Sequence, residues 1–432
     1  MKIKVKNMRY EDVLALPKAK YHKPLRQHLL FRIILKILSM PDMLCTRFQC
    51  RKIGMEKLGK GEPCLILMNH SSFIDLKIAS TILFPRPFNI VCTADAFIGK
   101  NWLMRLIGCI PTRKFVTDAK LVRDMVYALK ELKSSVLMFP EAGYSFDGTA
   151  TTLPDSLGRC LKILGVPVVI IRTYGAFARD PLYNGLRLRK VKVSADMEYV
   201  LSPQDIAEKT SEELNEIIRK GFDFDNFRWQ QENEIRIKEP FRAQGLNRVL
   251  YKCPHCKTEG KMLGKGTKLI CQACGKEYVL TELGYMKALE GDTEFAHIPD
   301  WFRWQRDCVR EEIVKGTYSL DVSVDICMLV NTKCIYRVGE GRLVHTSEGF
   351  MLSGCEGKLQ YTQKPSSLYT LNADYFWYEM GDIICIGDSN RSYYCFPKTT
   401  EDIVAKTRLA TEEMYKLAKE NKRKKLEKAE EV

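Results

Sequence analysis

The sequence predicts an α/β protein in which a sheet is sandwiched by helices and a β-rich module follows toward the C-terminus. Two patterns lead to this prediction. Between residues 61 and 245, short apolar runs that end at polar turns alternate with amphipathic segments, as strands and helices do in an α/β sandwich. From residue 317 to 397, short β-type runs follow one another with glycine turns between them, which suits a small β-sandwich or barrel.

Composition and charge exclude some classes of protein and favour others. The chain has 432 residues, 45% of them hydrophobic, which is ample for packed cores and excludes wholesale disorder. The formal net charge is +15, but residues 1–60 hold 15 Lys and Arg against 4 Asp and Glu, so the rest is close to neutral. Nucleic-acid binders usually carry such charge inside the folded domain. A basic segment at one end instead favours binding to an acidic surface, and an anionic membrane is the strongest candidate.

Cysteine usage and the N-terminal sequence bear on localisation. The chain opens with MKIKVKNMRYEDV, which lacks the apolar region of a secretory signal. Four of the 16 cysteines form two C-x-x-C pairs and twelve are scattered, which suits a reducing cytosol. No run reaches the roughly 18–20 apolar residues that a membrane-spanning helix needs. We therefore expect a peripheral protein at the cytoplasmic face of a membrane.

The basic arm, residues 1–60, contains an apolar helix predicted over residues 24–44. Arg32 and Lys36 lie four residues apart on one stripe of this helix, and Pro41 is expected to end it. One interpretation is a helix in a membrane interface, with its cations among lipid phosphates. The other is a core helix with two snorkelling cations. The helix alone leaves both open, and the positive charge around it favours the membrane.

The α/β domain is assigned to residues 61–245. Buried strands are predicted where apolar runs end at polar turns, over residues 64–70, 88–95, 135–141 and 166–177. Residues 189–203 alternate like an edge strand. Amphipathic helices are predicted over residues 121–133 and, with a capping-box start, over residues 210–222.

The composition changes beyond residue 245, and four further segments are predicted. They are a segment rich in lysine and glycine (246–285), a helical linker (286–316), a β-rich domain (317–398) and a charged C-terminal helix (399–432). Seven or so strands and a final helix are compatible with an architecture of pleckstrin-homology type. This comparison concerns architecture only, since no motif accompanies it.

His70 ends the first predicted strand, in the sequence Asn-His-Ser-Ser-Phe-Ile-Asp. In α/β folds, functional residues commonly lie in a turn between a strand and a helix. Ser71 and Ser72 can cap the helix that follows. The turn can bring Asp75 beside the imidazole, where a carboxylate fixes the tautomer and makes the other ring nitrogen a better base. On spacing alone, a structural role is the commoner outcome for such a pair.

Three further segments extend this signal into a series. GCIPTRK supplies Gly108 and Arg113, FPEAGYS supplies Glu141 and Ser145, and GVPVVII supplies a strand that begins at Val-Pro. Together with Asn69, His70 and Asp75, these segments resemble the four motifs of the glycerolipid acyltransferases, the lysophosphatidic acid acyltransferase family. The motifs stand in the family's order and cover about residues 60–240.

The resemblance implies acyl transfer and assigns a role to each position. It makes His70 the general base and Asp75 the residue that orients it. It implies that Arg113 binds the phosphate of the acceptor and that Glu141 positions the acceptor. It implies further substrate-binding positions at Asn69, Gly108 and Ser145. The donor it implies is acyl-CoA or an acyl-carrier protein. The acceptor it implies is a lysophospholipid, by default 1-acyl-sn-glycerol-3-phosphate, which would give phosphatidic acid.

Elementary chemistry agrees with these roles. An alcohol that attacks a thioester needs a base near neutrality, and a phosphate is held well by a planar cation. The N–H groups at the helix start after His70 are expected to stabilise the oxyanion.

The third motif departs from the family pattern. Its glutamate is normally followed by Gly-Thr-Arg, and here Ala142, Gly143 and Tyr144 occupy those positions. One phosphate contact is therefore missing, which weakens the case for 1-acyl-sn-glycerol-3-phosphate but not for acyl transfer. A tyrosine can hydrogen-bond to a different head group or stack on it. Another lysolipid or a glycolipid is therefore the alternative acceptor.

Two C-x-x-C pairs, Cys253 with Cys256 and Cys271 with Cys274, are separated by 14 residues. Four thiolates at this spacing close a tetrahedral site, so the segment resembles a zinc ribbon with structural Zn²⁺ and no open ligand position. His255 lies inside the first knuckle and is expected to be exposed. A redox pair is the alternative, against which two facing pairs argue.

Two other classes of function remain open beside an enzyme. Zinc ribbons often bind nucleic acid, and residues 248–280 hold 7 Lys and Arg against 2 Asp and Glu. Nucleic acid is nevertheless a poor partner, because only Tyr251 and Tyr278 are available for stacking. The ribbon can equally bind a protein or brace two domains. The third class is an inactive lipid-binding scaffold, against which His70 and Asp75 argue.

Overall fold

The computed structural model describes residues 3–113, 118–141, 143–388 and 390–430. It divides into two compact units, each with its own sheets. The α/β unit comprises residues 20–182 and 186–239, and the second unit comprises residues 1–19, 183–185 and 240–432. The segment predicted as a basic arm is therefore divided between the two units.

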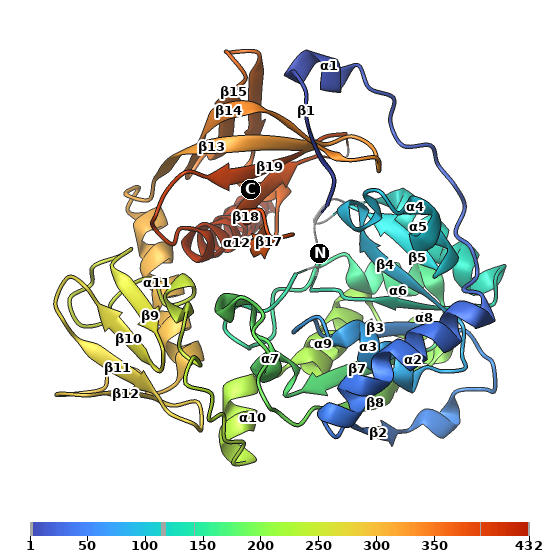
Figure 1. Ribbon diagram of the computed structural model, residues 1–432. Helices are drawn as coiled ribbons and strands as arrows, with labels where there is room; N and C mark the ends of the chain where they lie inside the picture. The colour runs from blue at the N-terminus through green and yellow to red at the C-terminus, as the bar shows by residue number, and fades with distance from the viewer. Residues whose placement is uncertain (1–2, 114–117, 142, 389, 431–432) are drawn as a thin grey trace. The chain divides into compact units, whose positions relative to one another are not determined.

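A seven-stranded sheet forms the centre of the α/β unit, in the order β2-β8-β7-β3-β6-β4-β5 (Figure 1). The strands are β2 (Gln49–Ile53), β8 (Ser194–Leu201), β7 (Val168–Tyr174), β3 (Leu65–Met68), β6 (Ser135–Met138), β4 (Phe88–Thr93) and β5 (Cys109–Thr112). The five strands from β7 to β5 are parallel, whereas β8 is antiparallel to β7 and parallel to β2. The carboxyl ends of five strands therefore meet at one edge.

Helices cover both faces of this sheet, as predicted. Along β3, Ile66 and Met68 face one core, and Leu65 and Leu67 face the other. The first core is covered by α3 (Asp75–Ile82) and the end of α2 (Leu29–Cys45), and the second by α5 (Ala119–Lys130), α6 (Leu157–Leu164), α8 (Pro203–Glu208) and α9 (Ser211–Phe222). The capping box predicted for α9 is present between Thr210 and Glu213. The other helices of this unit are η1 (Met55–Lys57), η2 (Ala94–Phe97), α4 (Asn101–Leu106), α7 (Ala176–Arg179) and α10 (Asn226–Glu232).

The prediction of an edge strand over residues 189–203 was wrong. That segment contains β8, which lies between β7 and β2. The edge is β2, a strand of mostly exposed residues with the sequence QCRKI. Because β2 has little apolar character, its sequence gave no strand signal, and the alternation of β8 was attributed to an edge.

The helix α2 begins at Leu29 after His28, whose side chain accepts a hydrogen bond from the Leu30 N–H. It runs past Pro41 to Cys45, so the prediction that Pro41 ends the helix was wrong. Tertiary contacts hold the last turn: Met43 enters the first core, and Asp42 forms ion pairs with Lys77 and Arg179.

Most of the large side chains of α2 are exposed. Eight apolar residues have more than a third of their surface in solvent: Leu29, Leu30, Ile33, Ile34, Ile37, Leu38, Met40 and Leu44. The two cations on the helix contact protein instead, since Arg32 donates to the Pro85 carbonyl and the Lys36 ammonium lies 4.1 Å from the centre of the Phe84 ring. Among the described residues, no helix is both long enough and apolar enough to cross a bilayer.

The second unit contains a four-stranded antiparallel sheet, in the order β12-β11-β10-β9. Its strands are β9 (Met262–Lys265), β10 (Lys268–Cys271), β11 (Glu277–Leu280) and β12 (Met286–Ala288). The helix α11 (Ile298–Val314) packs against this ribbon through Trp301, which is fully buried and donates from its indole N–H to the Lys252 carbonyl at 3.0 Å. Gln305 of the same helix bonds the backbone of Val249 and Lys252.

The β-rich module of the second unit has seven antiparallel strands in the order β16-β15-β14-β13-β19-β18-β17. They are β13 (Leu320–Leu329), β14 (Ile335–Thr346), β15 (Gly349–Gly354), β16 (Leu359–Gln363), β17 (Asn372–Trp377), β18 (Gly381–Gly387) and β19 (Ser392–Pro397). Two of the predicted runs merge into β14. The first strand of the chain, β1 (Val5–Asn7), pairs in parallel with β14.

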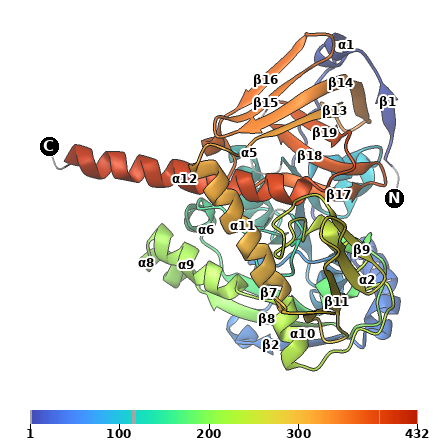
Figure 2. The ribbon, with the colours of Figure 1, turned by 90° about the vertical axis from the view of Figure 1, so that its left-hand side faces the viewer.

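The charged C-terminal helix, α12 (Val404–Glu430), packs beside α11, and its C-terminal half extends past the strands of the module (Figure 2). Ion pairs join the two helices, because Arg306 bonds Glu412 and Glu413, and Arg310 bonds Glu413 and Glu420. The remaining short helices of the chain are α1 (Tyr10–Leu14), η3 (Leu182–Asn184), η4 (Leu246–Arg248) and η5 (Pro365–Ser367).

Candidate functional site

Three neighbouring strands of the α/β sheet bring the first, third and fourth predicted motifs together. His70 follows β3, Glu141 follows β6 on one side of it, and β7 lies on the other side. The loops after parallel strands share one edge of a sheet, which is where ligands bind in open α/β folds. The backbone N–H of Ser145 donates to the His70 carbonyl at 3.2 Å, so the first and third motifs are in direct contact.

The His70 imidazole and the Asp75 carboxylate form a dyad. The distance between His70 Nδ1 and Asp75 Oδ2 is 3.0 Å. The carboxylate is almost fully buried, whereas His70 exposes 22% of its side chain. With Nδ1 directed at a carboxylate, the other ring nitrogen, Nε2, is the one that can exchange a proton with a substrate.

The loop between His70 and Asp75 departs from two expectations. The residue before α3 is Ile74 and its side chain forms no cap, so Ser71 and Ser72 do not cap the helix. Instead, the N–H groups of Ser71 and Ser72 donate to Asp75 Oδ2 at 2.8 and 3.0 Å. These two N–H groups are therefore occupied by Asp75, and the prediction that N–H groups at the helix start stabilise an oxyanion stays a prediction for the others.

Two aromatic rings enclose the imidazole. The Phe139 ring stacks on one side, with its centroid 4.2 Å from that of His70, and the Tyr144 ring lies 4.1 Å away. Tyr144 also contacts Phe73, at 5.6 Å between centroids, and Phe73 is 59% exposed. The tyrosine that replaces a family residue thus packs on the histidine itself, an arrangement that the sequence did not predict.

Glu141 is a buried carboxylate that ties the site together. Its Oε2 accepts from the His70 backbone N–H at 2.7 Å, and its Oε1 accepts from the N–H and hydroxyl of Thr151 at 2.8 and 3.2 Å. Only 2% of the residue is exposed. In this geometry Glu141 fixes the backbone that carries the histidine.

Asn69 and Ser145 also form bonds within the protein. The side-chain oxygen of Asn69 accepts from the N–H and hydroxyl of Thr173 at the end of β7. The Ser145 hydroxyl donates to the Thr149 carbonyl at 2.7 Å and accepts from the Gly148 N–H. Both residues therefore stabilise the loops that carry the dyad, and their predicted contact with substrate stays a prediction.

The second motif lies on β5, the outer strand of the sheet. Gly108 is at the amino end of β5, at the opposite edge of the sheet from His70; its φ is +87°, and a side chain would meet the Phe88 carbonyl at 3.1 Å. Arg113 follows the carboxyl end, three strands from β3, which corresponds to about 14 Å across the sheet. The structure thus brings His70, Asp75, Glu141 and Ser145 together, and Gly108 and Arg113 lie apart from them.

The sequence gave no signal for two charged residues at the end of β7. Arg179 and Asp180 are 8% and 3% exposed; Arg179 is the last residue of α7 and Asp180 follows it, at the same edge of the sheet as His70. The charged pair follows a buried strand, but it belongs to none of the four motifs. Burial raises the pKa of the Asp180 carboxyl to about 6, and Arg179 opposes that shift.

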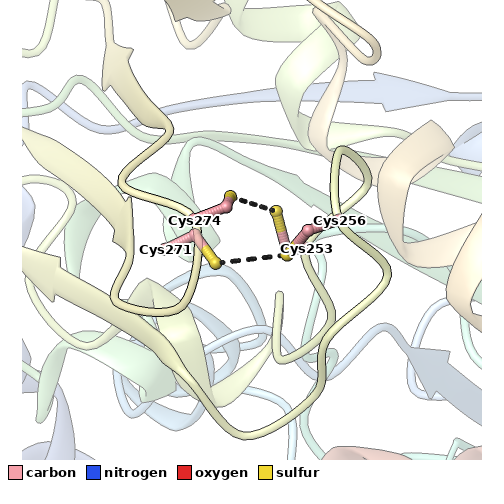
Figure 3. Close-up of side chains that lie close together, drawn as sticks. All are labelled: Cys253, Cys256, Cys271 and Cys274. Carbon is pink, nitrogen blue, oxygen red and sulfur yellow. Dashed lines mark hydrogen bonds between the residues drawn. The ribbon is translucent and has the colours of Figure 1, made fainter.

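A second candidate site is the cysteine cluster of the ribbon (Figure 3). The sulfurs of Cys253, Cys256, Cys271 and Cys274 all lie within 4.8 Å of one another. The distance is 3.9 Å between Cys253 Sγ and Cys274 Sγ and 3.7 Å between Cys256 Sγ and Cys271 Sγ. Zn–S bonds of about 2.3 Å in a tetrahedron place sulfurs about 3.8 Å apart, so the cluster fits such an ion.

The knuckles have matching backbone bonds. In the first knuckle, the Lys257 N–H donates to the Cys253 carbonyl at 3.0 Å. In the second, the Gly275 N–H donates to the Cys271 carbonyl at 2.8 Å. His255 is exposed, as expected, and its Nδ1 lies 3.2 Å from a Glu294 oxygen, outside the cluster. The four thiols thus form a closed set with no histidine in it.

A family model matches the part of the chain that holds the first site. Residues 49–172 match the family model described as Acyltransferase. This range begins at β2 and includes the loops with His70, Arg113, Glu141 and the strand of the fourth motif. Among solved structures, the chain is similar to the crystal structure of the 1-acyl-sn-glycerophosphate (LPA) acyltransferase PlsC from Thermotoga maritima. The identity is 17% and the TM-score 0.37, over 48% of this chain and 80% of that one.

The fold and the motifs at the carboxyl edge of its sheet define the class of the protein: the chain carries an acyltransferase domain. The matched residues include positions from all four motifs, in line with the resemblance seen in the sequence.

Proposed function

We propose that the chain is a membrane-peripheral O-acyltransferase that transfers a fatty acyl group to the hydroxyl of a lysophospholipid. The donor is acyl-CoA or an acyl-carrier protein, and the default acceptor is 1-acyl-sn-glycerol-3-phosphate. The observation that carries the proposal is the His70–Asp75 dyad at the carboxyl edge of the sheet, inside the acyltransferase domain.

In the proposed reaction, His70 Nε2 accepts the proton of the acceptor hydroxyl while Asp75 holds Nδ1. The hydroxyl oxygen bonds to the thioester carbonyl carbon, and the carbon–sulfur bond then breaks. The thiolate leaves with the proton from the imidazolium, so the products are an ester and a free thiol. The aromatic faces of Phe139 and Tyr144 favour the imidazolium while it exists.

Two features support a membrane as the place of reaction. The exposed apolar residues of α2 form a continuous row along one helix, and three more exposed apolar residues of the α/β unit are Phe73, Leu76 and Trp102. Contiguous apolar surface of this kind marks an interaction site. Phe73 contacts Tyr144, which stacks on His70, so one of these exposed apolar side chains lies beside the dyad. An acceptor with its acyl chain in the bilayer would then present its head group to His70.

Structural zinc is the proposed occupant of the cysteine cluster. The four thiols fit a tetrahedral site, and burial raises the pKa of the Cys253 thiol while the N–H groups of His255 and Cys256 oppose the shift. A bound cation would favour the thiolates and hold the knuckles together. The ribbon contributes no group to the proposed chemistry.

Binding of nucleic acid by the ribbon is the second candidate function, and contacts within the ribbon argue against it. Lys252 pairs with Glu259 and Glu312, and Lys268 pairs with Glu277. Lys276 donates to two backbone carbonyls. These cations already have partners within the protein. The basic excess of the segment therefore offers few free charges to phosphates.

Release of free thiol tests the proposal. Purified protein is incubated with acyl-CoA and a panel of lysolipids on anionic vesicles, and thiol is followed with and without each acceptor. We expect release that depends on an acceptor, and a loss of at least 100-fold in His70→Ala. His345→Gln is the control, since His345 lies in the other unit. Release with no acceptor, or full turnover by His70→Ala, would contradict the proposal, and salt-sensitive binding to nucleic acid alone would favour the ribbon.

A further inference from the structure

A chain of ionic contacts leads from the partly exposed Asp42 on α2 through a buried arginine toward the dyad. Asp42, on α2, forms ion pairs with Lys77 on α3 and with the Arg179 guanidinium. The other end of the same guanidinium donates from Nη1 to Asp180 Oδ2 at 3.2 Å. A single buried arginine thus connects a carboxylate on the apolar helix with a carboxylate at the active edge of the sheet.

Asp180 in turn lies beside the loop of the dyad. The Ser72 hydroxyl hydrogen-bonds to Asp180, and the Ser72 backbone N–H donates to Asp75 Oδ2 at 3.0 Å. Ser72 therefore holds both carboxylates. The second oxygens of Asp75 and Asp180 are buried, and neither has a hydrogen-bond partner among the described residues.

This arrangement is electrostatically costly. Two carboxylates lie near each other in a buried environment, and the charge of Asp75 disfavours ionisation of Asp180. Burial raises the pKa of Asp180 to about 6, and the charge of Asp75 adds to the shift. Buried carboxylates of this kind concentrate at functional sites, since packing alone would be satisfied by apolar residues.

We propose that Arg179 and Asp180 are positioning residues for the acyl transfer proposed above. Asp180 holds Ser72, and through it the loop between His70 and Asp75. Arg179 fixes Asp180 to α2, so the helix with the exposed apolar face and the general base share one rigid network. The inference rests on the proposed function, because it assigns these residues to the same site.

A consequence for charge follows from the geometry. Among the described residues, Glu141 and Asp180 contact the loop of the dyad, and Arg179 and Asp75 lie around Asp180; the arginine links Asp180 to Asp42, which pairs with Lys77. An ionised Asp180 adds a negative charge behind Asp75, which favours the imidazolium of His70. Removing that charge while keeping the shape should make His70 easier to deprotonate.

Steady-state kinetics of two variants test the proposal, each with a matched control. Asp180→Asn removes the charge, and its control is Asp196→Asn, a buried carboxylate on β8 that bonds Arg51 and Tyr174. Arg179→Lys keeps the charge but cannot reach both carboxylates. Its control is Arg172→Lys, which pairs with Glu198 on the same sheet. The readouts are kcat, the KM for acyl-CoA and the pH profile of kcat/KM.

For Asp180→Asn we expect a fall in kcat of about 10-fold, a KM within about twofold of the parent, and an acid limb displaced to lower pH by about 0.5 unit or more. For Arg179→Lys we expect a similar fall in kcat and no displacement of the acid limb of the pH profile. The position of the limb does not depend on how much of a preparation is folded, so the test holds even for a less stable variant.

The inference would be overturned if the kinetics of both variants matched those of their controls, or if the acid limb of the pH profile did not move in Asp180→Asn. Either outcome would leave the proposed acyl transfer intact. Full turnover by His70→Ala would instead overturn the proposed function. The two failures are therefore distinguishable.

Discussion

The imidazole of His70 is bonded at one edge to Asp75 and covered on its faces by Phe139 and Tyr144. This geometry has two consequences. The carboxylate fixes the tautomer, and the rings limit rotation of the imidazole. Tyr144 matters most in this arrangement, because it stands where the family motif has another residue and because its ring also contacts Phe73.

Replacing Tyr144 should separate the role of its ring from that of its hydroxyl. We expect Tyr144→Leu to lower kcat about 10-fold, since stacking on a cation contributes roughly 1–2 kcal/mol in a partly desolvated site. Tyr144→Phe keeps the ring and should stay within about threefold of the parent. Steady-state thiol release measures both variants. A loss in Tyr144→Phe as large as in Tyr144→Leu would show that the hydroxyl, not the ring, is what matters.

His345, in the β-rich module, provides a prediction on pH and stability. It is 1% exposed, bonds the Tyr318 hydroxyl at 3.0 Å and stacks on Phe350 at 3.7 Å. Burial lowers the pKa of His345 to about 3, whereas an unfolded chain binds the proton near pH 6.5. The unfolded state therefore binds more protons between these values, and stability falls as the pH decreases below about 6.5.

We expect the unfolding midpoint of the parent to fall more steeply between pH 7 and pH 5 than that of His345→Gln, which carries no titrating group there. The difference in the free energy of unfolding is at most about 1.4 kcal/mol per pH unit. Thermal unfolding followed by circular dichroism at three pH values measures it. Parallel pH dependences of the two proteins would contradict the assignment.

Among the elements, α2 has the clearest surface. Its apolar residues face solvent, and only Ser39 and Met43 are buried along its length. The cations that the sequence suggested would meet lipid phosphates instead contact the loop at Phe84 and Pro85. Binding to a bilayer through α2 would therefore depend mainly on apolar burial, which predicts weak sensitivity to salt.

The double variant Ile37→Glu with Leu38→Glu tests this surface. The two side chains are 58% and 63% exposed, so folding should tolerate the change. Losing the burial of two such side chains costs roughly 2 kcal/mol each, so sedimentation with anionic vesicles should weaken by more than 10-fold. Ile163→Glu is the control, since Ile163 is 57% exposed on α6. Equal losses in the control and the double variant would argue against α2 as the contact.

The sequence predicted those elements whose own residues carry a strong pattern. The buried parallel strands, the capped helix α9 and the two helices α11 and α12 were all recognisable locally. The strand β2 was missed because its residues are polar, and α2 passes Pro41 because Asp42 and Met43 are held by distant partners. The same reason applies to the site: His70, Asp75 and Glu141 stand in motifs, whereas Arg179 and Asp180 are brought to the dyad only by the fold.

At the scale of the whole molecule, the second unit depends on the ribbon for part of its core. Trp301 of α11 is buried against Tyr278 of β11, with 5.0 Å between ring centroids, and α11 carries the arginines that pair with α12. Loss of the ribbon would therefore expose one side of α11 and weaken the pairs with Glu412 and Glu413. A metal bound by the four cysteines would therefore stabilise this unit.

Metal analysis and hydrogen exchange test this dependence. We expect one zinc per chain by elemental analysis, lost in Cys253→Ser and retained in Cys308→Ser, since Cys308 lies on α11 outside the cluster. Chelation should speed amide exchange in β9–β12 and α11 by at least 10-fold, because metal binding contributes several kcal/mol to folding of such sites. The central strands β3, β6 and β7 should change little. Zinc content unaffected by Cys253→Ser, or exchange that rises equally in both units, would contradict a structural site in the ribbon.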